Sequence, residues 1–475
     1  MSAKAKLLFA ASEVYPFAKS GGLADVAHSL PRALNRDYDL TVVMPLYRKV
    51  DRDRFGIAVL DECFDIVMGG VEYPVELYGC EYEGVHYRFI YSPLLCDREF
   101  LYGPPESGYD DNAVRFGIFN YAIVELLKRE RYDIAHLNDW QSALSALLVD
   151  EAGEIETKTV FTIHNLAYQG TFEADMLQKL GLNESCFTMS GIEFYGQINF
   201  MKAGIAYADR VTTVSPTYAK EILTSEFGCG LEGFLLEHQY KLSGIVNGID
   251  TEHFSPSDDR ALTEPYSDLT GKAVNKKAYL KEVTLKGLKR PLFIFIGRFT
   301  WQKGMELLIG TLPKIALMEC NIAILGEGEG KYHEDLKAIA DEHTNIHLEF
   351  GYDESLSHRM YAAADFLLMP SLFEPCGLNQ IIAMHYGAAP VVHHVGGLVD
   401  TVQPDKEFDP ASADGYGVVF TRPTERSFGN ALQRADELYA DKRRYNRITK
   451  HNMECDFSWQ ESAKSYRALY GMVTQ

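Results

Sequence analysis

The segment Lys19-Ser20-Gly21-Gly22 joins a basic side chain to two glycines just ahead of a helical pattern. Glycines allow backbone N–H groups to approach a ligand closely, and the positive end of the following helix favours an anion. Lys19 adds a point charge. The segment therefore suits a phosphate or diphosphate group. An ordinary strand-to-helix turn with a solvated lysine is the alternative.

A second basic segment, Gly297–Gly304, contains Arg298 and Lys303. Arg298 follows a buried strand at its carboxyl end, where open α/β sheets bind ligands. The two cations lie close together between glycines, in a chain that is otherwise short of positive charge. The pair indicates a site for an anionic substrate, although a solvated loop would carry the same residue types.

A third segment, Ser371–Gln380, places a carboxylate ahead of a helix start. Pro375 suits the first turn of a helix, and we expect the helix to continue through Met384. The free N–H groups after Pro375, near Gly377, can hold phosphate oxygens or sugar hydroxyls. Glu374 can face a cation-like sugar centre. A carboxylate that only complements the helix dipole is the alternative.

Two further polar pairs follow apolar runs, His136-Leu137-Asn138-Asp139 and His164-Asn165. The carboxyl ends of neighbouring parallel strands meet at one edge of a sheet, so we expect both segments to point into the same crevice. Their side chains can bond to sugar hydroxyls or to a leaving group. Histidines with a purely structural role are the alternative.

Short apolar runs alternate with helical patterns such as Val114–Arg129 and Tyr332–Glu342, and this alternation predicts parallel sheets covered on both faces. Two series of strands are expected. The first is Lys6–Ala11, Leu40–Met44, Ile134–Leu137, Thr159–Ile163 and Arg210–Val214, and the second is Pro291–Ile296, Asn321–Leu325, Ile346–Phe350, Asp365–Met369 and Ala389–Val392. Two doubly wound domains follow, with a boundary near Val246–Asp250.

The stretch Phe457–Tyr470 is expected to form an isolated amphipathic helix with Ser458 as its N-cap. No strand follows it, so we expect it to pack back on the first domain. The pattern Gly21-Gly22-Leu23-Ala24-Asp25 recurs as Gly396-Gly397-Leu398-Val399-Asp400. Either this echo is chance, or two facing domains each offer a helix N-terminus to one cleft.

The bulk properties exclude several classes of protein. A chain of 475 residues exceeds one hydrophobic core, and a net charge of −21 disfavours nucleic-acid and membrane-surface roles. The 8 cysteines follow no metal-binding spacing, which indicates free thiols and a cytoplasmic location or a similar reducing space. No apolar stretch approaches the ~18 residues of a membrane span.

Gly326-Glu327-Gly328-Glu329-Gly330 superficially looks like a dinucleotide fingerprint. Its spacing differs from that motif, and two glutamates would repel a pyrophosphate. We interpret it as a tight turn, and a nicotinamide-dependent enzyme is not expected.

Together these segments resemble the bacterial glycogen synthase and plant starch synthase family. The matching motifs occur in order along nearly the whole chain: KSGGLAD, HLNDW, FTIHN, VNGID, GRFTWQKG, GYDESLSHR, PSLFEPCGLNQ and GGLVDTV. The resemblance implies an α/β fold of two facing Rossmann-like domains (the glycosyltransferase B type) with the active site in the cleft. It implies residues 1–246 as the acceptor-side domain, with 457–475 packed on it, and residues 247–456 as the nucleotide-sugar domain.

The same resemblance implies a retaining hexosyltransferase that moves glucose from ADP-glucose to the non-reducing end of an α-1,4-glucan in glycogen biosynthesis. No cofactor and no metal are expected. The implied catalytic residues are Glu374, His164, Arg298 and Lys303. The implied donor-binding residues are Lys19, Gly21, Gly22, Asn247, Tyr352 (which packs on the base), Gly377, Leu378 and Asn379. Those implied on the acceptor side are Asp25, Tyr102, Asp139 and Asn165.

Three positions depart from the family pattern: Gln141 replaces a histidine, Asn379 a threonine, and His393 an arginine. All three retain hydrogen bonding, so they bear on donor or acceptor preference. In the expected mechanism Arg298 and Lys303 neutralise the departing diphosphate, and the acceptor enters from the same face. Double displacement through a protein carboxylate is the alternative.

Three rival functions share parts of this description. A glucan phosphorylase would be longer and would carry pyridoxal phosphate, and a nucleotide-sugar epimerase would need no glucan. A glucan-binding protein without activity would not need Arg298, Lys303 and Glu374 together.

Overall fold

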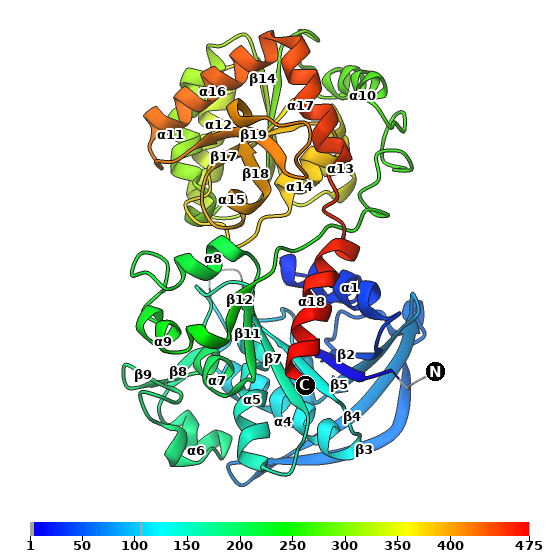
Figure 1. Ribbon diagram of the computed structural model, residues 1–475, viewed down its shortest axis with the longest axis vertical. Coiled ribbons are helices and arrows are strands. Elements are labelled where there is room, and N and C mark those ends of the chain that lie inside the picture. The colour runs from blue at the N-terminus through cyan, green and yellow to red at the C-terminus, as the bar shows by residue number, and fades with distance from the viewer. Residues whose placement is uncertain (1–3, 105–106, 475) are drawn as a thin grey trace. The chain divides into compact units, whose positions relative to one another are not determined.

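The computed structural model describes residues 4–104 and 107–474 (Figure 1). The chain forms two compact units. The first contains the residues up to Val214, then Ala219–Ile245, and finally the segment from Trp459. The second contains Ser215–Tyr218 and Val246–Ser458. Residues 1–3 and 475, which the sequence assigns to the first domain and to its returning helix, lie outside the described range.

The first unit is built on a nine-stranded sheet with the order β12-β11-β7-β6-β1-β2-β5-β4-β3. Its parallel strands are β1 (Lys6–Ala10), β2 (Asp39–Pro45), β5 (Val85–Tyr91), β6 (Ile134–Asn138), β7 (Lys158–Ile163), β11 (Arg210–Thr213) and β12 (Leu242–Gly244). The strands β3 (Ala58–Met68) and β4 (Val71–Tyr82) extend it as an antiparallel edge. A small separate sheet contains β8 (Thr171–Glu173), β9 (Glu193–Phe194) and β10 (Gln197–Asn199).

The central strand β1 shows why this unit folds as a parallel sheet. Its residues Leu7 to Ala10 are fully buried, because neighbouring strands and helices cover both faces. Such strands have uniformly apolar sequences. The accompanying helices are α1 (Gly22–Leu34), α2 (Arg52–Phe55), α3 (Pro93–Cys96), α4 (Asn112–Arg129), α5 (Trp140–Ala152), α6 (Met176–Leu180), α7 (Phe200–Tyr207), α8 (Pro216–Glu221, its first residues assigned to the second unit) and α9 (Glu232–Glu237).

Helix α18 (Trp459–Val473) belongs to the first unit, although the second unit precedes it in the chain. It packs beside α1, as Figure 1 shows. Arg467 pairs with Asp37 at 2.7 Å, and the Tyr470 hydroxyl lies 2.6 Å from Nδ1 of His136 on β6. The helix that the sequence predicts at this position therefore has its partners in the first unit.

The second unit contains a seven-stranded, fully parallel sheet with the order β15-β14-β13-β16-β17-β19-β18. Its strands are β13 (Leu292–Ile296), β14 (Asn321–Gly326), β15 (Ile346–Phe350), β16 (Phe366–Met369), β17 (Ala389–His393), β18 (Val402–Pro404) and β19 (Gly415–Phe420). Its helices are α10 (Leu269–Glu282), α11 (Met305–Ala316), α12 (Gly330–Glu342), α13 (Glu354–Ala363), α14 (Asn379–His385), α15 (Gly397–Thr401), α16 (Glu425–Ala440) and α17 (Lys442–Glu454).

Each strand in the two predicted series corresponds to an observed strand, with ends that differ by one residue or so. The predicted α/β class with parallel sheets is therefore confirmed. The sequence analysis did not predict the antiparallel strands β3 and β4. Most side chains of β4 are at least partly exposed, so this edge lacks the apolar run that marks a buried strand.

No described helix is both long enough and apolar enough to span a membrane. The cysteines, all of which are described, form no disulfide.

Candidate active site

In the first unit the candidate residues gather where the chain changes direction across the sheet. The strands β2 and β5 lie on one side of β1 in the sheet, and the later strand β6 lies on the opposite side of β1. Ligands of open α/β sheets bind at such switch points, beyond the carboxyl ends of the strands. The loops that leave β1, β6 and β7 carry the predicted polar residues.

Asp139 and His164 are brought together at this edge, as the sequence predicts. The carboxylate of Asp139 accepts a hydrogen bond from the backbone N–H of His164 at 2.7 Å, and the His164 ring Nε2 lies 2.9 Å from Oδ1 of Asn138. Asp139 has a φ of 55°, which L-residues rarely adopt. Such strain is maintained where a side chain must be held in a fixed direction.

Burial changes the charge states of this pair. It lowers the pKa of His164 to about 3, so the ring is neutral at neutral pH. Burial raises the pKa of Asp139 to about 7, although backbone hydrogen bonds from His164 and Asn165 act in the opposite direction and lower it. A neutral imidazole beside a carboxyl that ionises near neutral pH can exchange hydrogen bonds with sugar hydroxyls without carrying fixed charge into the site.

A buried carboxylate, Glu13, also belongs to this group, and the sequence analysis did not assign it a role. Its Oε2 accepts hydrogen bonds from the backbone N–H of Ser20 at 2.5 Å and from the Ser20 hydroxyl at 2.6 Å. Burial raises its pKa despite these bonds. Tyr102, which is predicted on the acceptor side, bonds to Ser12 at 2.7 Å. Glu13 follows β1 as Asp139 follows β6, and that position was the available signal.

The Gly21-Gly22 turn opens α1, as predicted, but Lys19 is not held out to solvent. Its Nζ lies 2.7 Å from Oδ1 of Asp25 in the first turn of α1. A second lysine, Lys49, reaches the Lys19 carbonyl at 3.5 Å, and burial lowers its pKa. A bound phosphate would therefore compete with Asp25 for Lys19 and would find Lys49 nearby.

His136 has the structural role that the sequence left open. It is fully buried, with Nδ1 on the Tyr470 hydroxyl and Nε2 on the Thr162 hydroxyl, both at 2.6 Å. Burial lowers its pKa to about 3. His136 thus holds α18 against the sheet and lies outside the group of candidate site residues.

In the second unit the switch point lies between β13 and β16. The loop after β13 carries Arg298 and Lys303, and the loop after β16 carries Glu374. The two loops bond to each other, because the Leu372 N–H donates to the Gln302 carbonyl at 2.9 Å. Both predicted segments are therefore parts of one structure.

Lys303 and Glu374 form an ion pair at the centre of this structure. Nζ of Lys303 lies 2.7 Å from Oε2 of Glu374, which also accepts from the Ser371 hydroxyl at 2.9 Å. Glu374 is only 5% exposed. Arg298 is exposed, and its guanidinium bonds to no residue in the described parts of the chain. Arg298 is thus available to an anion from outside.

The helix expected from Pro375 begins later, and that prediction was wrong. The observed helix α14 starts at Asn379, because Gly377 has a φ of 72°, which is incompatible with a helix. Residues between Pro375 and Leu378 form an irregular turn instead. The Asn379 side chain donates to the Ile296 carbonyl at the end of β13, at 2.7 Å, and so ties this turn to the Arg298 loop.

Asn247 lies beside the same turn, where its backbone N–H opposes the rise that burial causes in the pKa of the Cys376 thiol. The side chain is 5% exposed, yet its Oδ1 makes no hydrogen bond with the described residues. A buried acceptor without a partner is costly, so a ligand hydroxyl is the natural donor for it. His393 donates a hydrogen bond from Nδ1 to the Ser371 carbonyl at 2.7 Å, and this bond stabilises the loop that carries Glu374.

Tyr352 follows β15 and is 72% exposed. An aromatic ring with this much exposed surface can stack on a base. The glycine-rich run that the sequence analysis interprets as a tight turn is extended instead: Gly326 ends β14, Gly328 forms a β-bridge with Phe299, and Gly330 begins α12. Its backbone packs against the Arg298 loop, since a Cβ on Gly326 would lie 1.9 Å from the Gly297 carbonyl oxygen.

Two doubly wound, largely parallel sheets in one chain, each with polar and charged groups at its switch point, form the arrangement expected of a glycosyltransferase of the B type. Family descriptions agree: residues 6–237 match the starch synthase catalytic domain, and residues 277–451 match glycosyl transferases group 1. The chain is 40% identical to the glycogen synthase of Geotalea daltonii over 98% of its length and 99% of that protein. It is also 40% identical to the glycogen synthase of Aquifex aeolicus, over 98% and 99% of the two chains.

Among solved structures, the catalytic domain of starch synthase IV from Arabidopsis thaliana, bound to ADP and acarbose, matches with a TM-score of 0.92. That match has 34% identity and covers 99% of this chain and 100% of the other. The chain therefore belongs to the glycogen synthase and starch synthase family, and it is a hexosyltransferase.

Proposed function

We propose that this enzyme transfers glucose from ADP-glucose to the non-reducing end of an α-1,4-glucan, with retention of configuration, in glycogen biosynthesis. The observation that carries the proposal is the Lys303–Glu374 pair beside the exposed Arg298. Two cations and one carboxylate at a sheet switch point match the needs of a sugar diphosphate. The ADP in the starch synthase IV structure supports the choice of nucleotide.

In this proposal Arg298 and Lys303 bind the diphosphate and stabilise the charge that develops as it leaves. Preorganised donors of this type typically contribute ~3–4 kcal/mol each. Glu374 lies beside the transferred glucose, where its negative charge favours a cation-like anomeric carbon. Gly377, Leu378 and Asn379 supply backbone and amide groups, and the unpartnered Oδ1 of Asn247 accepts from a donor hydroxyl.

The first unit supplies the other groups. Lys19 and the Gly21-Gly22 turn contribute to donor binding, and His164 bonds to the sugar as a neutral ring. On the acceptor side we place Asp25, Tyr102, Asp139 and Asn165. Because all cysteines are free thiols, a reducing cytoplasm is the proposed location.

The test is an assay of ADP release with glycogen as acceptor, run with ADP-glucose and UDP-glucose side by side. The proposal expects release that depends on glycogen and is faster with ADP-glucose, and new α-linkages in the product by proton NMR. Isomerised sugar in the absence of glycogen would establish an epimerase instead. Glucan binding without ADP release would establish a binding protein.

A further inference from the structure

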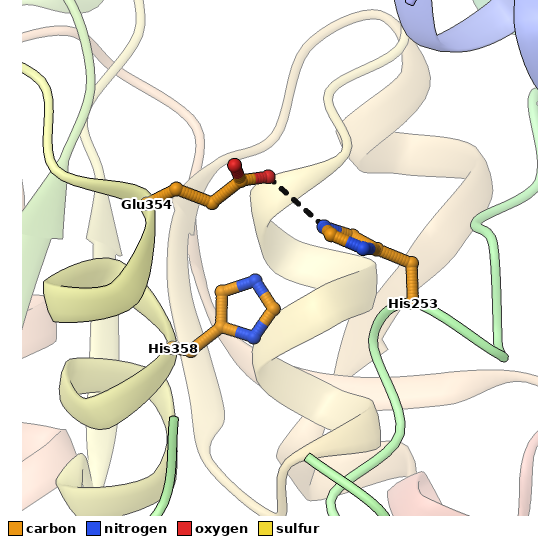
Figure 2. Close-up of side chains that lie close together, drawn as sticks. All are labelled: His253, Glu354 and His358. Atoms are coloured by element: carbon orange, nitrogen blue, oxygen red, sulfur yellow. Dashed lines mark hydrogen bonds and ion pairs between the residues drawn. The ribbon is translucent and has the colours of Figure 1, made fainter. Parts of the chain in front are cut away.

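A compact group of metal-ligand side chains lies in the second unit, in residues that the proposed reaction does not use. His253 comes from the segment after Val246, whereas Glu354 and His358 lie four residues apart on α13 and share one helix face. One potential ligand atom from each residue lies within 4.8 Å of the others. Figure 2 shows the three side chains turned toward a common space.

His358 presents a lone pair to this space. Its Nδ1 lies 2.7 Å from Oδ2 of Asp259, and a carboxylate can only accept, so Nδ1 carries the proton. The other nitrogen, Nε2, then holds the lone pair. His358 is 5% exposed, and its Nε2 makes no hydrogen bond with the described residues. In Figure 2 a ring nitrogen points toward Glu354 and His253.

The surroundings of His358 match those of a metal-ligating histidine. Such a ring usually donates its second N–H to a carboxylate, which fixes its orientation and makes the ligating nitrogen more basic. Asp259 has this position, and it is itself held by the Tyr386 hydroxyl at 2.6 Å and by the Ala261 N–H at 2.9 Å. This second layer exists on the buried side of the group, away from solvent.

We propose that His253, Glu354 and His358 bind one Zn²⁺ ion, with water as the fourth ligand. Two imidazoles and one carboxylate form a common zinc donor set, whereas Mg²⁺ and Ca²⁺ prefer oxygen ligands. Tetrahedral bonds of about 2.0–2.2 Å separate ligand atoms by roughly 3.3–3.6 Å. His253 Nε2 and Glu354 Oε1 lie 2.9 Å apart, so the ion replaces the proton that they share.

The two outer ligands have room to adjust to the ion. The side chains of His253 and Glu354 are 35% and 37% exposed, which also leaves the fourth position open to water. The ion would fasten the segment around His253 to the first turn of α13. That turn directly follows Tyr352, so zinc would order the loop that carries this aromatic ring.

The experiment measures Zn²⁺ binding to the chelator-treated full chain by titration calorimetry, with Co²⁺ as a spectroscopic replacement. The variants are His253→Ala and Glu354→Gln, which alter the partly exposed ligands. His86→Ala is the matched control, because His86 is an exposed histidine on β5 in the first unit. His358 is left intact, since its substitution would disturb the core.

Wild-type chain and His86→Ala are expected to bind one Zn²⁺ per chain with equal affinity and to melt at a higher temperature with zinc. His253→Ala and Glu354→Gln should bind at least about 10- to 100-fold more weakly and lose most of the shift in melting temperature. The Co²⁺ spectrum should show tetrahedral geometry without thiolate bands. The proposal is overturned if wild type takes up no zinc, if His253→Ala binds as wild type does, or if thiolate bands appear. None of these readouts depends on glucosyl transfer.

Discussion

Nζ of Lys303 lies 2.7 Å from Oε2 of Glu374, so one of the two cations expected to hold the diphosphate is already paired with the carboxylate expected beside the sugar. The other cation, Arg298, is exposed and lacks such a partner among the described residues. The two residues therefore differ in what their removal should do to the fold.

Arg298→Ala should abolish most activity without weakening the fold. We expect kcat to fall about 10²- to 10³-fold, as for the loss of one preorganised donor, with little change in glucan binding. The free energy of unfolding should change by less than about 0.5 kcal/mol, because an exposed side chain is removed. Steady-state kinetics and urea unfolding measure the two effects. Near-wild-type turnover would contradict the assigned role.

Lys303→Ala should lower kcat as strongly as Arg298→Ala does, and it should also destabilise the protein. Glu374 would remain as a buried carboxylate without its cation, at a cost of at least about 2 kcal/mol in the free energy of unfolding. The double variant with Glu374→Gln should recover much of that stability and none of the activity. If Lys303→Ala unfolds at the same urea concentration as wild type, the ion pair does not contribute to the stability of the fold.

Gly22→Ala tests whether a ligand approaches the start of α1. A Cβ on Gly22 would meet no protein atom within 4 Å, so the fold should tolerate it. We expect at least a tenfold higher KM for ADP-glucose, because the methyl group would fill space that the donor needs. Gly471→Ala in α18 also meets nothing within 4 Å and is the matched control, with unchanged kinetics.

Tyr352→Ala should raise the KM for the donor and leave stability unchanged. Stacking of a base on an aromatic ring contributes about 1–3 kcal/mol, which corresponds to roughly a 5- to 100-fold change in affinity. Tyr240, which is 78% exposed in the first unit, provides the control Tyr240→Ala. Equal KM values in the two variants would exclude a role of Tyr352 in nucleotide binding.

His136 should make stability depend on pH. Burial lowers its pKa from 6.5 to about 3, so between these values the unfolded chain binds a proton that the folded chain does not. The stabilisation is present above about pH 6.5 and is lost as the pH falls. Between about pH 6 and pH 4 the wild-type free energy of unfolding should fall by about 1.4 kcal/mol per pH unit more than that of His136→Gln. Parallel slopes in urea unfolding would show that His136 is protonated in the fold.

The sequence predicted those parts of the fold that depend on uniformly apolar strands. The strands around β1 and β13 are buried on both faces, and their composition identifies them without tertiary information. Most side chains of the antiparallel strands β3 and β4 are at least partly exposed, and these segments are strands because β4 pairs with β5 and β3 pairs with β4. The prediction that α14 begins at Pro375 was wrong because Gly377 adopts a left-handed φ. That φ depends on the local surroundings of Gly377, which the sequence pattern does not reveal.

Within the candidate site, the sequence predicted the groups that follow strands, including Asp139 and His164, which the structure joins by a hydrogen bond. It did not assign Glu13 or Lys49, since neither belongs to a glycine-rich or aromatic motif. It also could not decide whether His136 was structural. That question depended on Tyr470, 334 positions away in the sequence.

Helix α18 has a consequence for the order in which the protein matures on the ribosome. The first unit lacks this helix, and with it the partner of His136, until the whole second unit has been translated. At about 5–20 residues per second this delay is roughly 10–40 s. The second unit is contiguous apart from Ser215–Tyr218, and so the later-made unit can finish folding before the earlier one. A nascent-chain chaperone would meet an unfinished N-terminal sheet throughout that interval.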